Sequence, residues 1–345
     1  MKILFAGGGS VGHIAPSVAV WQAMKQLDAS TEPLFLCSDR MEDLNYIAKE
    51  RVPVRAVALP KRNLWMPMLL VQAYRQAALS IRLFKPDVVF SKGGAVSVPI
   101  CLAAWWKKIP IVLHESDARM GIANRMIAKI ADTVCLGFDE TMIVDPRMQV
   151  TGNPVRAGVT KGVKEEGLRI TGFSGDRPVL MVIGGSQGAT AINDVVRTLL
   201  PKLLETFDVI HLTGPGKNGA PKTAGYFAKE FAYEELPHLY AVTSVALSRA
   251  GAGGICELAA NGIPTILTPL RGVANDHQQA NALAAARSEG CIVLPQEKLS
   301  AELLPTLQNM IEPGRHVLLS ERISGLNPPN AAQRIAEIIR STAKK

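Results

Sequence analysis

The sequence predicts an α/β protein built from two doubly wound parallel sheets. Three observations lead to this fold class. The chain has 345 residues, enough for two domains; short apolar runs alternate with helical patterns; and this alternation stops and restarts after residue 150. Strands that alternate with helices form parallel sheets with both faces covered. We therefore expect two Rossmann-like domains facing one another across a cleft.

In the first half, each expected strand is a short apolar run, and each expected helix repeats apolar residues at a period of about 3.6. The expected strands are Lys2–Ala6, Pro33–Cys37, Val54–Ala58, Asp87–Phe90, Ile109–His114 and Thr133–Gly137. The expected helices are Ile14–Gln26, Met66–Phe84 and Gly121–Ile130. Because the strands are parallel, their carboxyl ends meet at one edge, where ligands bind in such sheets.

The pattern breaks at Thr151–Arg156, and we expect an irregular connection over Lys161–Arg177, which has no apolar periodicity. Residues 1–154 and 155–328 are therefore the expected domains. In the second, the expected strands are Pro178–Ile183, Phe207–Leu212, Val245–Ser248 and Pro264–Thr268. The expected helices are Ala189–Glu205, Gly254–Ala260 and Asp276–Ser288, with a further helix over Pro329–Lys345.

Composition narrows the classes of function. The 38 basic and 30 acidic residues give a net charge of +8, which favours an anionic partner such as a nucleotide or a lipid headgroup. Only 5% of the residues are aromatic, and none interleave with a basic tract, so we expect no nucleic acid partner. Five scattered cysteines indicate a reducing compartment. The uncharged stretch Gly93–Trp106 is too short to cross a bilayer.

Three glycine-rich turns follow expected strands: Gly7–His13, Gly184–Gly188 and Ser248–Gly254. Each would present bare backbone amides and the positive end of a helix to phosphate oxygens. Gly7–Gly12 also fits the dinucleotide pattern, and Asp39 lies where an oxidoreductase would need its acid. The alternative for every turn is that its glycines only permit a tight bend.

Few other side chains form a recognisable chemical motif. Glu257 lies one turn inside the helix after the third glycine turn, where it could accept two ribose hydroxyls or simply favour the positive helix end. His114–Glu115 ends a strand, and such a pair is as often structural as catalytic. The sequence contains no D-x-D or H-E-x-x-H motif. We therefore expect no metal site.

Leu59–Lys85 combines basic and apolar side chains and contains no acidic residue. Trp65 and Pro67, near its start, are typical of a surface loop. Cations beside apolar side chains suit an anionic bilayer surface, so an anionic membrane surface is an expected partner. The alternative is an amphipathic helix that packs on the sheet and exposes a solvated basic face.

An ordered set of motifs, which spans nearly the whole chain, resembles the MurG family of glycosyltransferases. The motifs are Gly7–His13, Pro86–Gly94, His114–Glu115, Gly152–Arg156, Gly184–Ala189, Ser248–Gly251, Glu257 and Asp276–Gln279. The resemblance implies a GT-B-type, inverting, metal-independent enzyme. Such an enzyme moves N-acetylglucosamine from UDP-GlcNAc to undecaprenyl-diphosphate-N-acetylmuramoyl-pentapeptide, which converts lipid I to lipid II in peptidoglycan biosynthesis.

The resemblance also implies where the enzyme works and how its chain is arranged. It would lie peripherally on the cytoplasmic face of the inner or plasma membrane, where contacts with other cell-wall synthesis proteins are open to it. In this family the final helix, here 329–345, crosses back to the first domain.

The resemblance assigns roles to particular residues. His13 would be the catalytic base, with Glu115 orienting it. The implied substrate contacts near the reacting sugar and acceptor are Ser10, Val11, Gly12, Asp117 and Asn124. Those on the donor are Arg156, Ser186 and Gln187 near the diphosphate, Ala252, Gly253, Gly254, Ile255 and Cys256 through their amides, Glu257 at the ribose, Ala232 at uracil, and Gln278 or Gln279 at the sugar.

The sequence departs from this family's pattern at several positions. Asp117 stands where Asn is usual, Ser244 where an Asp commonly precedes a strand, and Gly253–Gly254 where Leu–Thr is frequent. Three alternatives remain at this point: a different GT-B transferase, an oxidoreductase that uses the first glycine turn, and a sugar-nucleotide-binding scaffold without turnover.

Overall fold

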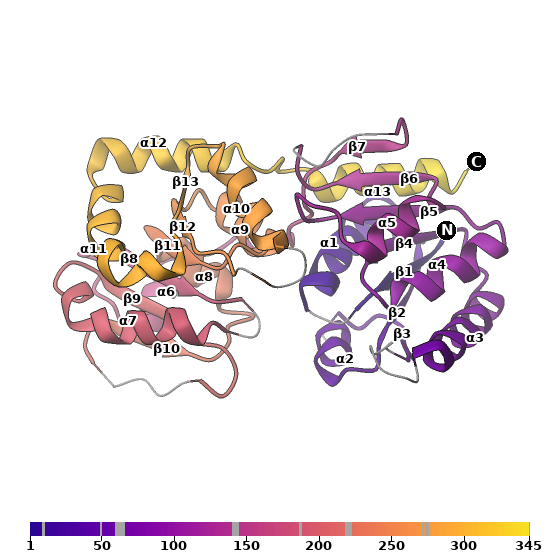
Figure 1. Cartoon of the computed structure of the whole chain (residues 1–345), viewed down its shortest axis with the longest axis horizontal. Helices are drawn as coiled ribbons and strands as arrows, with labels where there is room; N and C mark the ends of the chain where they lie inside the picture. The colour runs from indigo at the N-terminus through magenta and orange to yellow at the C-terminus, as the bar shows by residue number, and fades with distance from the viewer. Residues whose placement is uncertain are drawn as a thin grey trace. The chain divides into compact units, whose positions relative to one another are not determined.

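The computed structural model describes residues 1–8, 11–48, 50–58, 66–139, 145–185, 188–217, 223–270, 272 and 276–344. The chain forms two compact units. Unit 1 comprises Met1–Arg156 and Pro328–Lys345, and unit 2 comprises Ala157–Asn327. Each unit is a parallel sheet with helices packed on it (Figure 1), which confirms the predicted α/β class with two doubly wound sheets.

Among the described residues, the sheet of unit 1 has seven parallel strands in the order β3-β2-β1-β4-β5-β6-β7. The strands are β1 (Lys2–Gly7), β2 (Glu32–Ser38), β3 (Val54–Val57), β4 (Val88–Gly93), β5 (Ile111–Glu115), β6 (Thr133–Leu136) and β7 (Met148–Val150). The helices are α1 (Val11–Leu27), α2 (Met41–Ala48), α3 (Met66–Phe84), α4 (Ser97–Trp106), α5 (Ile122–Ala128) and α13 (Ala331–Thr342). The order reverses between β1 and β4, and such a switch point is where doubly wound sheets bind ligands.

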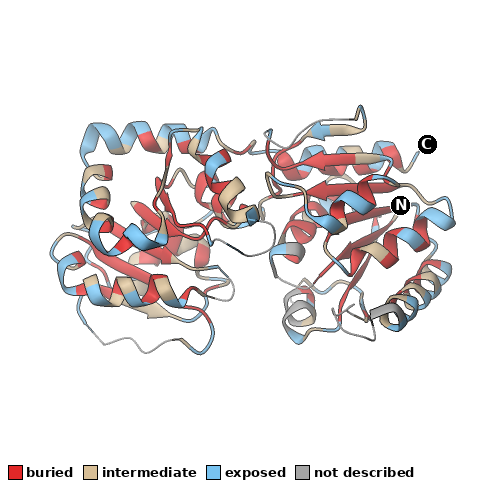
Figure 2. Cartoon of the chain, viewed as in Figure 1, coloured by how far each residue is buried: buried red, intermediate tan, exposed pale blue. Residues whose placement is uncertain are grey.

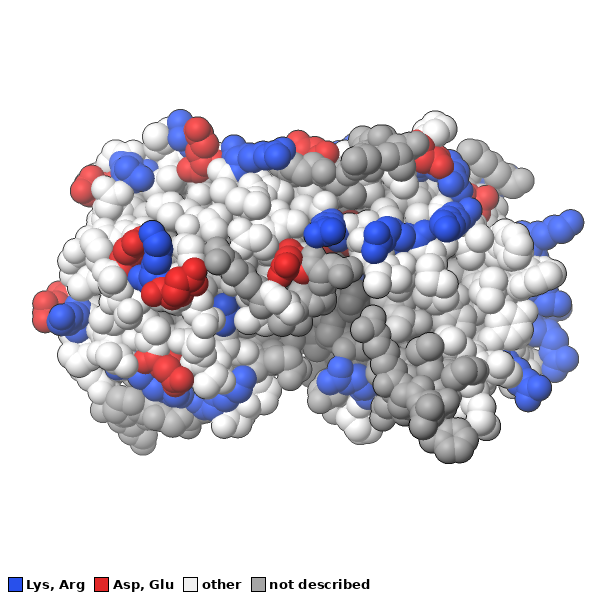
Figure 3. Space-filling view, in the orientation of Figure 1, with Lys and Arg blue, Asp and Glu red and all other residues white. Residues whose placement is uncertain are grey.

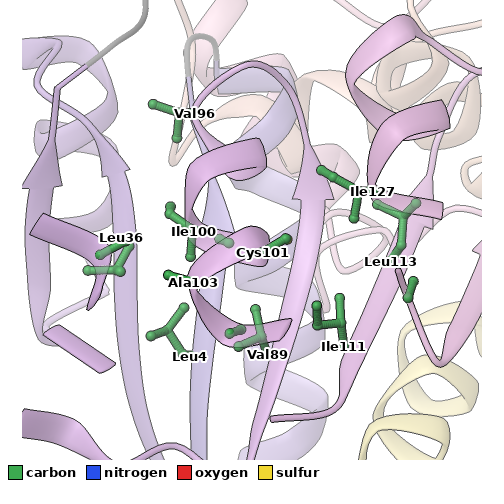
Figure 4. Close-up of a cluster of buried hydrophobic side chains, with 14 of the residues drawn as sticks. Leu4, Leu36, Val89, Val96, Ile100, Cys101, Ala103, Ile111, Leu113 and Ile127 are labelled. Carbon is green, nitrogen blue, oxygen red and sulfur yellow. The ribbon is translucent and has the colours of Figure 1, made fainter. Parts of the chain in front are cut away.

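The core of unit 1 explains why its strands are apolar on both faces. Leu4, Val89 and Leu113, on adjacent strands, belong to one buried cluster with Ile100 of α4 and Ile127 of α5 (Figure 4). Burying each such side chain contributes about 1.5–3 kcal/mol before entropy is counted. The inner strands are accordingly buried along most of their length, while the edge strands β3 and β7 and the outer faces of the helices are more exposed (Figure 2). Helix α13 packs on α1 and on β5.

Unit 2 repeats the same topology. Its described strands form a six-stranded parallel sheet in the order β10-β9-β8-β11-β12-β13, with its switch point between β8 and β11. The strands are β8 (Val179–Ile183), β9 (Asp208–Leu212), β10 (Tyr226–Lys229), β11 (Val245–Ser248), β12 (Thr265–Leu267) and β13 (Cys291–Val293). The helices are α6 (Lys164–Thr171), α7 (Thr190–Leu203), α8 (Leu236–Val242), α9 (Ala252–Ala260), α10 (His277–Ala286), α11 (Leu299–Met310) and α12 (Pro313–Ser324).

The expected irregular connection over Lys161–Arg177 is wrong, because α6 lies within it. This helix has only eight residues, too few for its apolar face to give a clear periodic signal. Local chemistry supports it instead: Glu166 in its first turn pairs with Arg169, and Gly172 ends it in the left-handed conformation with φ 73°.

The structure also bears on how the chain relates to a bilayer. Within the part of the chain that the structure describes, no helix combines the length and the apolar character needed to cross a membrane.

Candidate functional site

Each unit gathers polar side chains and free amides at the carboxyl ends of its strands. In unit 1 the centre of this group is Glu115, the last residue of β5, whose side chain is almost fully buried. Its carboxylate accepts hydrogen bonds from the Asp117 amide at 2.9 Å, the Gly121 amide at 3.2 Å and Asn124 Nδ2 at 2.8 Å. Glu115 therefore fixes the loop between β5 and α5, including the departure at Asp117.

Asn124 and Gly93 interlock beside this carboxylate. Gly93 ends β4 with φ +84°, and a Cβ built there would lie 1.8 Å from Asn124 Oδ1. Only glycine satisfies both the backbone conformation and the lack of space. Asn124 is buried, and its side-chain amide donates to Glu115. This hydrogen bond fixes Asn124 to the end of β5.

Lys92 brings a cation into the same group. It lies in β4 with only 2% of its surface exposed. Burial lowers the pKa of Lys92, while the nearby charges of Glu115 and Asp117 act to raise it. Burial raises the pKa of Glu115, an effect that Lys92 opposes. The buried ammonium thus lies where it can favour negative charge at this edge of the sheet.

His114, the neighbour of Glu115, is completely buried, and its Nε2 lies 3.1 Å from the carbonyl oxygen of Gly152. Because a carbonyl can only accept, Nε2 carries the proton. Burial lowers the pKa of His114 well below its usual value, and the charge of Lys92 lowers it further. His114 therefore ties β5 to the segment after β7, which is a structural role.

The first glycine turn leads directly into α1. Helix α1 begins at Val11 and contains Gly12 and His13, so the predicted base lies in its first turn. The structure describes only the backbone of Val11 and His13. Ser10 lies outside the described residues.

In unit 2, two glycine turns start side by side at the switch point. Ile183 at the end of β8 pairs with Ser248 at the end of β11, and the Arg249 amide donates to Ile183 O at 3.3 Å. The turn after β8 bends at Gly185 and Gly188, with φ +82° and +67°. Of the predicted residues in that turn, Ser186 and Gln187 lie outside the described part of the chain.

The turn after β11 exposes the amino end of α9. Its N-cap residue, Gly251, makes no side-chain capping bond, so the first amides of the helix have no acceptor within the helix. The amide of Ile255, a predicted donor contact, donates to Gly251 O at 3.1 Å. Ala252, Gly253 and Gly254 thus carry the free first-turn amides, and a Cβ at Gly253 would have no neighbour within 4 Å.

Arg249 and α10 hold this turn in place. Arg249 is largely buried and donates to Thr268 O at 3.1 Å and to Gln296 Oε1 at 2.7 Å. Asn281 of α10 donates to Ala250 O at 3.1 Å. These contacts bring the start of α10, with the predicted Gln278 and Gln279, beside the turn. Gln278 Oε1 accepts from the Leu270 amide at 3.0 Å.

Glu257 lies one turn into α9 and is partly exposed. Its Oε2 accepts a hydrogen bond from the hydroxyl of Tyr240 at 3.1 Å. Ala232, the predicted uracil contact, is buried in the loop before α8. That loop is closed by an ion pair between Lys229 and Glu235.

Ser244 and Arg156 are two further positions singled out from the sequence. Ser244 is at the amino end of β11, where its Oγ accepts from the Val179 amide at 3.1 Å; this departure from the MurG pattern therefore supports strand pairing. Arg156, a predicted diphosphate contact, is the last residue of the first segment of unit 1 and is partly buried.

Over the described residues, the structure holds no group of three or more His, Cys, Asp or Glu side chains that could bind a metal ion. The donor sets that calcium, magnesium and zinc sites require are therefore not assembled in this part of the chain.

Comparison with known families identifies the chain. The model of the glycosyltransferase family 28 N-terminal domain matches residues 3–136, and that of the C-terminal domain matches residues 179–335. The chain belongs to glycosyltransferase family 28. This membership confirms the predicted resemblance and makes the oxidoreductase alternative wrong.

Curated relatives in family 28 carry the name UDP-N-acetylglucosamine–N-acetylmuramyl-(pentapeptide) pyrophosphoryl-undecaprenol N-acetylglucosamine transferase. One from Clostridium perfringens is 36% identical, over 99% of this chain and 98% of its own length. One from Lachnospira eligens is 35% identical, over 91% of this chain and 92% of its own.

Solved structures agree with the family 28 assignment. The crystal structure of MurG from Acinetobacter baumannii has a TM-score of 0.76 and 25% identity, and the match covers 99% of each chain. A UDP-GlcNAc 2-epimerase from Neisseria meningitidis has a TM-score of 0.71 at 16% identity, with 99% of each chain covered, which shows a shared fold alone. The predicted GT-B fold is thus confirmed.

Sequence reasoning gave no role to several buried polar residues of this family 28 chain: Lys92, Asn193, Arg249 and Tyr240. Asn193 of α7 donates to Thr213 O at 2.9 Å, which joins α7 to the loop after β9. Such residues can be noticed in the sequence when a polar residue interrupts an otherwise apolar run. Lys92, within the buried strand Val88–Gly93, is an example.

Proposed function

We propose that this chain transfers N-acetylglucosamine from UDP-GlcNAc to undecaprenyl-diphosphate-N-acetylmuramoyl-pentapeptide, converting lipid I to lipid II. Family 28 membership over both domains supports this reaction, as do the names of the full-length relatives. The observation that carries the donor half is the pair of turns at the switch point of unit 2, beside the free first-turn amides of α9.

The donor would bind in unit 2. Its diphosphate would accept hydrogen bonds from the amides of Ala252–Gly254, helped by the positive end of α9 and by Arg156 and the Ser186–Gln187 turn. The partly exposed Glu257 would accept the ribose hydroxyls. Amides and helix ends stabilise phosphate charge on their own, so we propose that donor binding needs no metal ion.

The uracil and the transferred sugar would be recognised by the flanking loops of unit 2. The loop at Ala232, closed by the Lys229–Glu235 ion pair, would read the uracil through its backbone. Gln278 or Gln279 would read the hydroxyls of N-acetylglucosamine, because both lie at the start of the helix that Asn281 ties to the third glycine turn.

The reaction would be a direct displacement with inversion. His13 would take the proton from the acceptor hydroxyl while its oxygen forms a bond to the anomeric carbon of the donor. The bond from that carbon to the phosphate oxygen then breaks, and UDP leaves with the electron pair into the field of the unit 2 amides. Glu115 uses three of about four acceptor positions of its carboxylate on its own loop, so we propose that it supports His13 mainly by fixing that loop.

The acceptor's lipid would be reached from the membrane surface through one face of unit 1. Helices α3, α4 and α5 pack in sequence, and together they form what we call the basic apolar face. Its exposed members are Met68, Val71, Arg75, Leu79, Arg82, Leu83, Lys85, Leu102, Trp105, Trp106, Lys107, Lys108, Arg119, Ile122, Arg125, Met126 and Lys129. Lys and Arg line the edge of unit 1 formed by α3 and α4 (Figure 3).

This face supports a peripheral position on the anionic, cytoplasmic side of the membrane. No acidic residue occurs within α3, α4 or α5, so cations beside apolar side chains can approach anionic headgroups without repulsion. Residues 59–65 of the predicted membrane segment lie outside the described residues. Contacts with other cell-wall synthesis proteins remain a prediction.

UDP release in the presence of UDP-GlcNAc and a lipid I analogue tests this function. We expect turnover that depends on both substrates, and a loss of about 100-fold or more in kcat for His13→Ala, since general base catalysis contributes about 10²–10⁴-fold. Binding of UDP-GlcNAc without turnover would indicate the scaffold alternative. Turnover with a water-soluble acceptor in place of the lipid I analogue would indicate a different GT-B transferase.

A further inference from the structure

Tyr240 is a buried tyrosine whose hydroxyl reaches the proposed donor site. It lies in α8 with only 2% of its surface exposed, and its phenolic oxygen is 3.1 Å from Glu257 Oε2. A carboxylate can only accept, so the phenol donates this bond. A fully enclosed ring thus holds one oxygen of a carboxylate that is otherwise partly open to solvent.

Helix α8 is fixed closely enough to define where that hydroxyl lies. It packs against α6 and the segment before it through two glycines that allow backbone to approach backbone. A Cβ at Gly162 would lie 1.9 Å from Pro237 O, and one at Gly167 would lie 2.2 Å from His238 O. The loop that enters α8 is closed by the Lys229–Glu235 ion pair and by a bond from the Tyr233 amide to Glu235 Oε2.

We propose that Tyr240 is a positioning residue that holds Glu257 in the conformer that accepts the ribose hydroxyls of the donor. This inference rests on the proposed function. Glutamate has several rotatable bonds, and a ligand that must first order them binds less tightly. The Tyr240 hydroxyl holds Oε2 before the donor arrives, which orders the carboxylate in advance.

Helix α8 also links the two parts of nucleoside recognition. Its entry loop contains Ala232, the proposed uracil contact, and its body contains Tyr240, which acts on the proposed ribose contact. The spacing between uracil and ribose in the donor is covalent and fixed. One rigid element that sets both contacts would therefore select a ribonucleoside as a unit.

The test compares binding of UDP and 2′-deoxy-UDP to the full chain by calorimetry. In the unaltered protein we expect UDP to bind about 10-fold or more tightly, because a hydrogen bond to a charged group is worth that much. Tyr240→Phe removes one oxygen and keeps the ring, and it should cut the preference to about threefold by freeing Glu257. In the transferase assay, KM for UDP-GlcNAc should rise while kcat changes less than about twofold.

Tyr226→Phe is the matched control. Tyr226 is buried in the same unit, and its hydroxyl is bonded to His211 at 2.8 Å. It should keep the preference for UDP. Both variants are checked for an unchanged unfolding transition, so that a change in preference is not a change in folding. If Tyr240→Phe kept the full preference for UDP, the positioning role would be wrong.

A double-mutant cycle with Glu257→Gln separates this inference from the function beneath it. If Tyr240 acts through Glu257, then Tyr240→Phe should change nothing further in the Glu257→Gln background. An undiminished effect in that background would overturn the inference and leave the role of Glu257 intact. If Glu257→Gln itself kept the preference for UDP, the ribose contact of the proposed function would fail instead.

Discussion

His211 is held neutral inside unit 2 by two neighbours. Asn193 gives its Nδ2 to Thr213 O, so its Oδ1 is free to accept from His211 Nε2 at 3.0 Å. His211 Nδ1 then accepts from the Tyr226 hydroxyl at 2.8 Å. Burial, together with the charge of Arg197, lowers the pKa of His211 to about 4.

This histidine should make stability fall on mild acidification. Its pKa is lower in the folded than in the unfolded state, so its contribution is present above the unfolded value of 6.5 and is lost as the pH falls toward about 4. Between pH 7 and pH 5 we expect a loss of about 2 kcal/mol in the free energy of unfolding. Urea titrations of the chain and of His211→Gln measure the effect, and equal pH dependence in the two proteins would contradict it.

At the residue scale, the sequence identified side chains close to the glycine turns, but not the residues to which they are hydrogen-bonded. Glu257 could be singled out because its place in the first turns of a helix follows from the glycines before it. Tyr240 could not, because its bond to Glu257 joins α8 to α9, and only the packing of these helices brings the two together. Lys92 was missed because it lies within β4, whose residues are all buried.

At the scale of single elements, glycine has opposite consequences in two helices of unit 2. In α9 a Cβ at Gly253 would enter open space, whereas in α6 a Cβ at Gly167 would lie 2.2 Å from His238 O. Neither glycine has a positive φ. The space around the helix, and not its backbone conformation, therefore decides what each substitution does.

We expect Gly253→Ala to raise the free energy of unfolding by up to about 1 kcal/mol, through helix propensity and reduced freedom of the unfolded chain. Gly167→Ala should lower it by about 1–3 kcal/mol, because α6 must move away from α8. Urea denaturation of the two variants provides the comparison. Stabilisation by both would show that the α6–α8 contact is looser than its geometry indicates.

Long apolar elements could be predicted from sequence, and short half-exposed ones could not. The runs that became β1, β8 and β11 are buried on both faces, which makes their pattern continuous. By contrast, β10 is a partly exposed edge strand of four residues, and α6 depends on contacts with α8. Tertiary packing stabilises these elements more than their own sequence does.

At the scale of the whole molecule, the basic apolar face should direct binding to anionic membranes. Trp105 and Trp106 are 47% and 65% exposed, which is unusual for side chains of this size. Lys107 and Lys108 follow them directly and are exposed. Near an anionic surface, each such cation contributes about 1 kcal/mol to membrane binding. The positive charge on this face therefore favours binding to anionic lipid.

Lys107→Gln with Lys108→Gln should weaken binding to vesicles containing anionic lipid by about 30-fold, the loss of two such contributions. Sedimentation with vesicles of anionic and of purely zwitterionic lipid measures this effect. Lys161→Gln with Lys164→Gln, which alters two exposed lysines of unit 2, is the matched control. Equal weakening by both pairs would mean that net charge matters and this face does not.

Unit 1 is assembled from two separate stretches of chain, whereas unit 2 is one continuous stretch. During translation, all of unit 2 leaves the ribosome before α13, which carries the buried Ile335 and Ile339 and packs on α1. Until then, the surface of unit 1 on which α13 packs stays exposed in the nascent chain. Unit 1, whose first segment is synthesised first, is therefore completed last. Until it is complete, it is a partly folded form with exposed apolar surface that chaperones would bind.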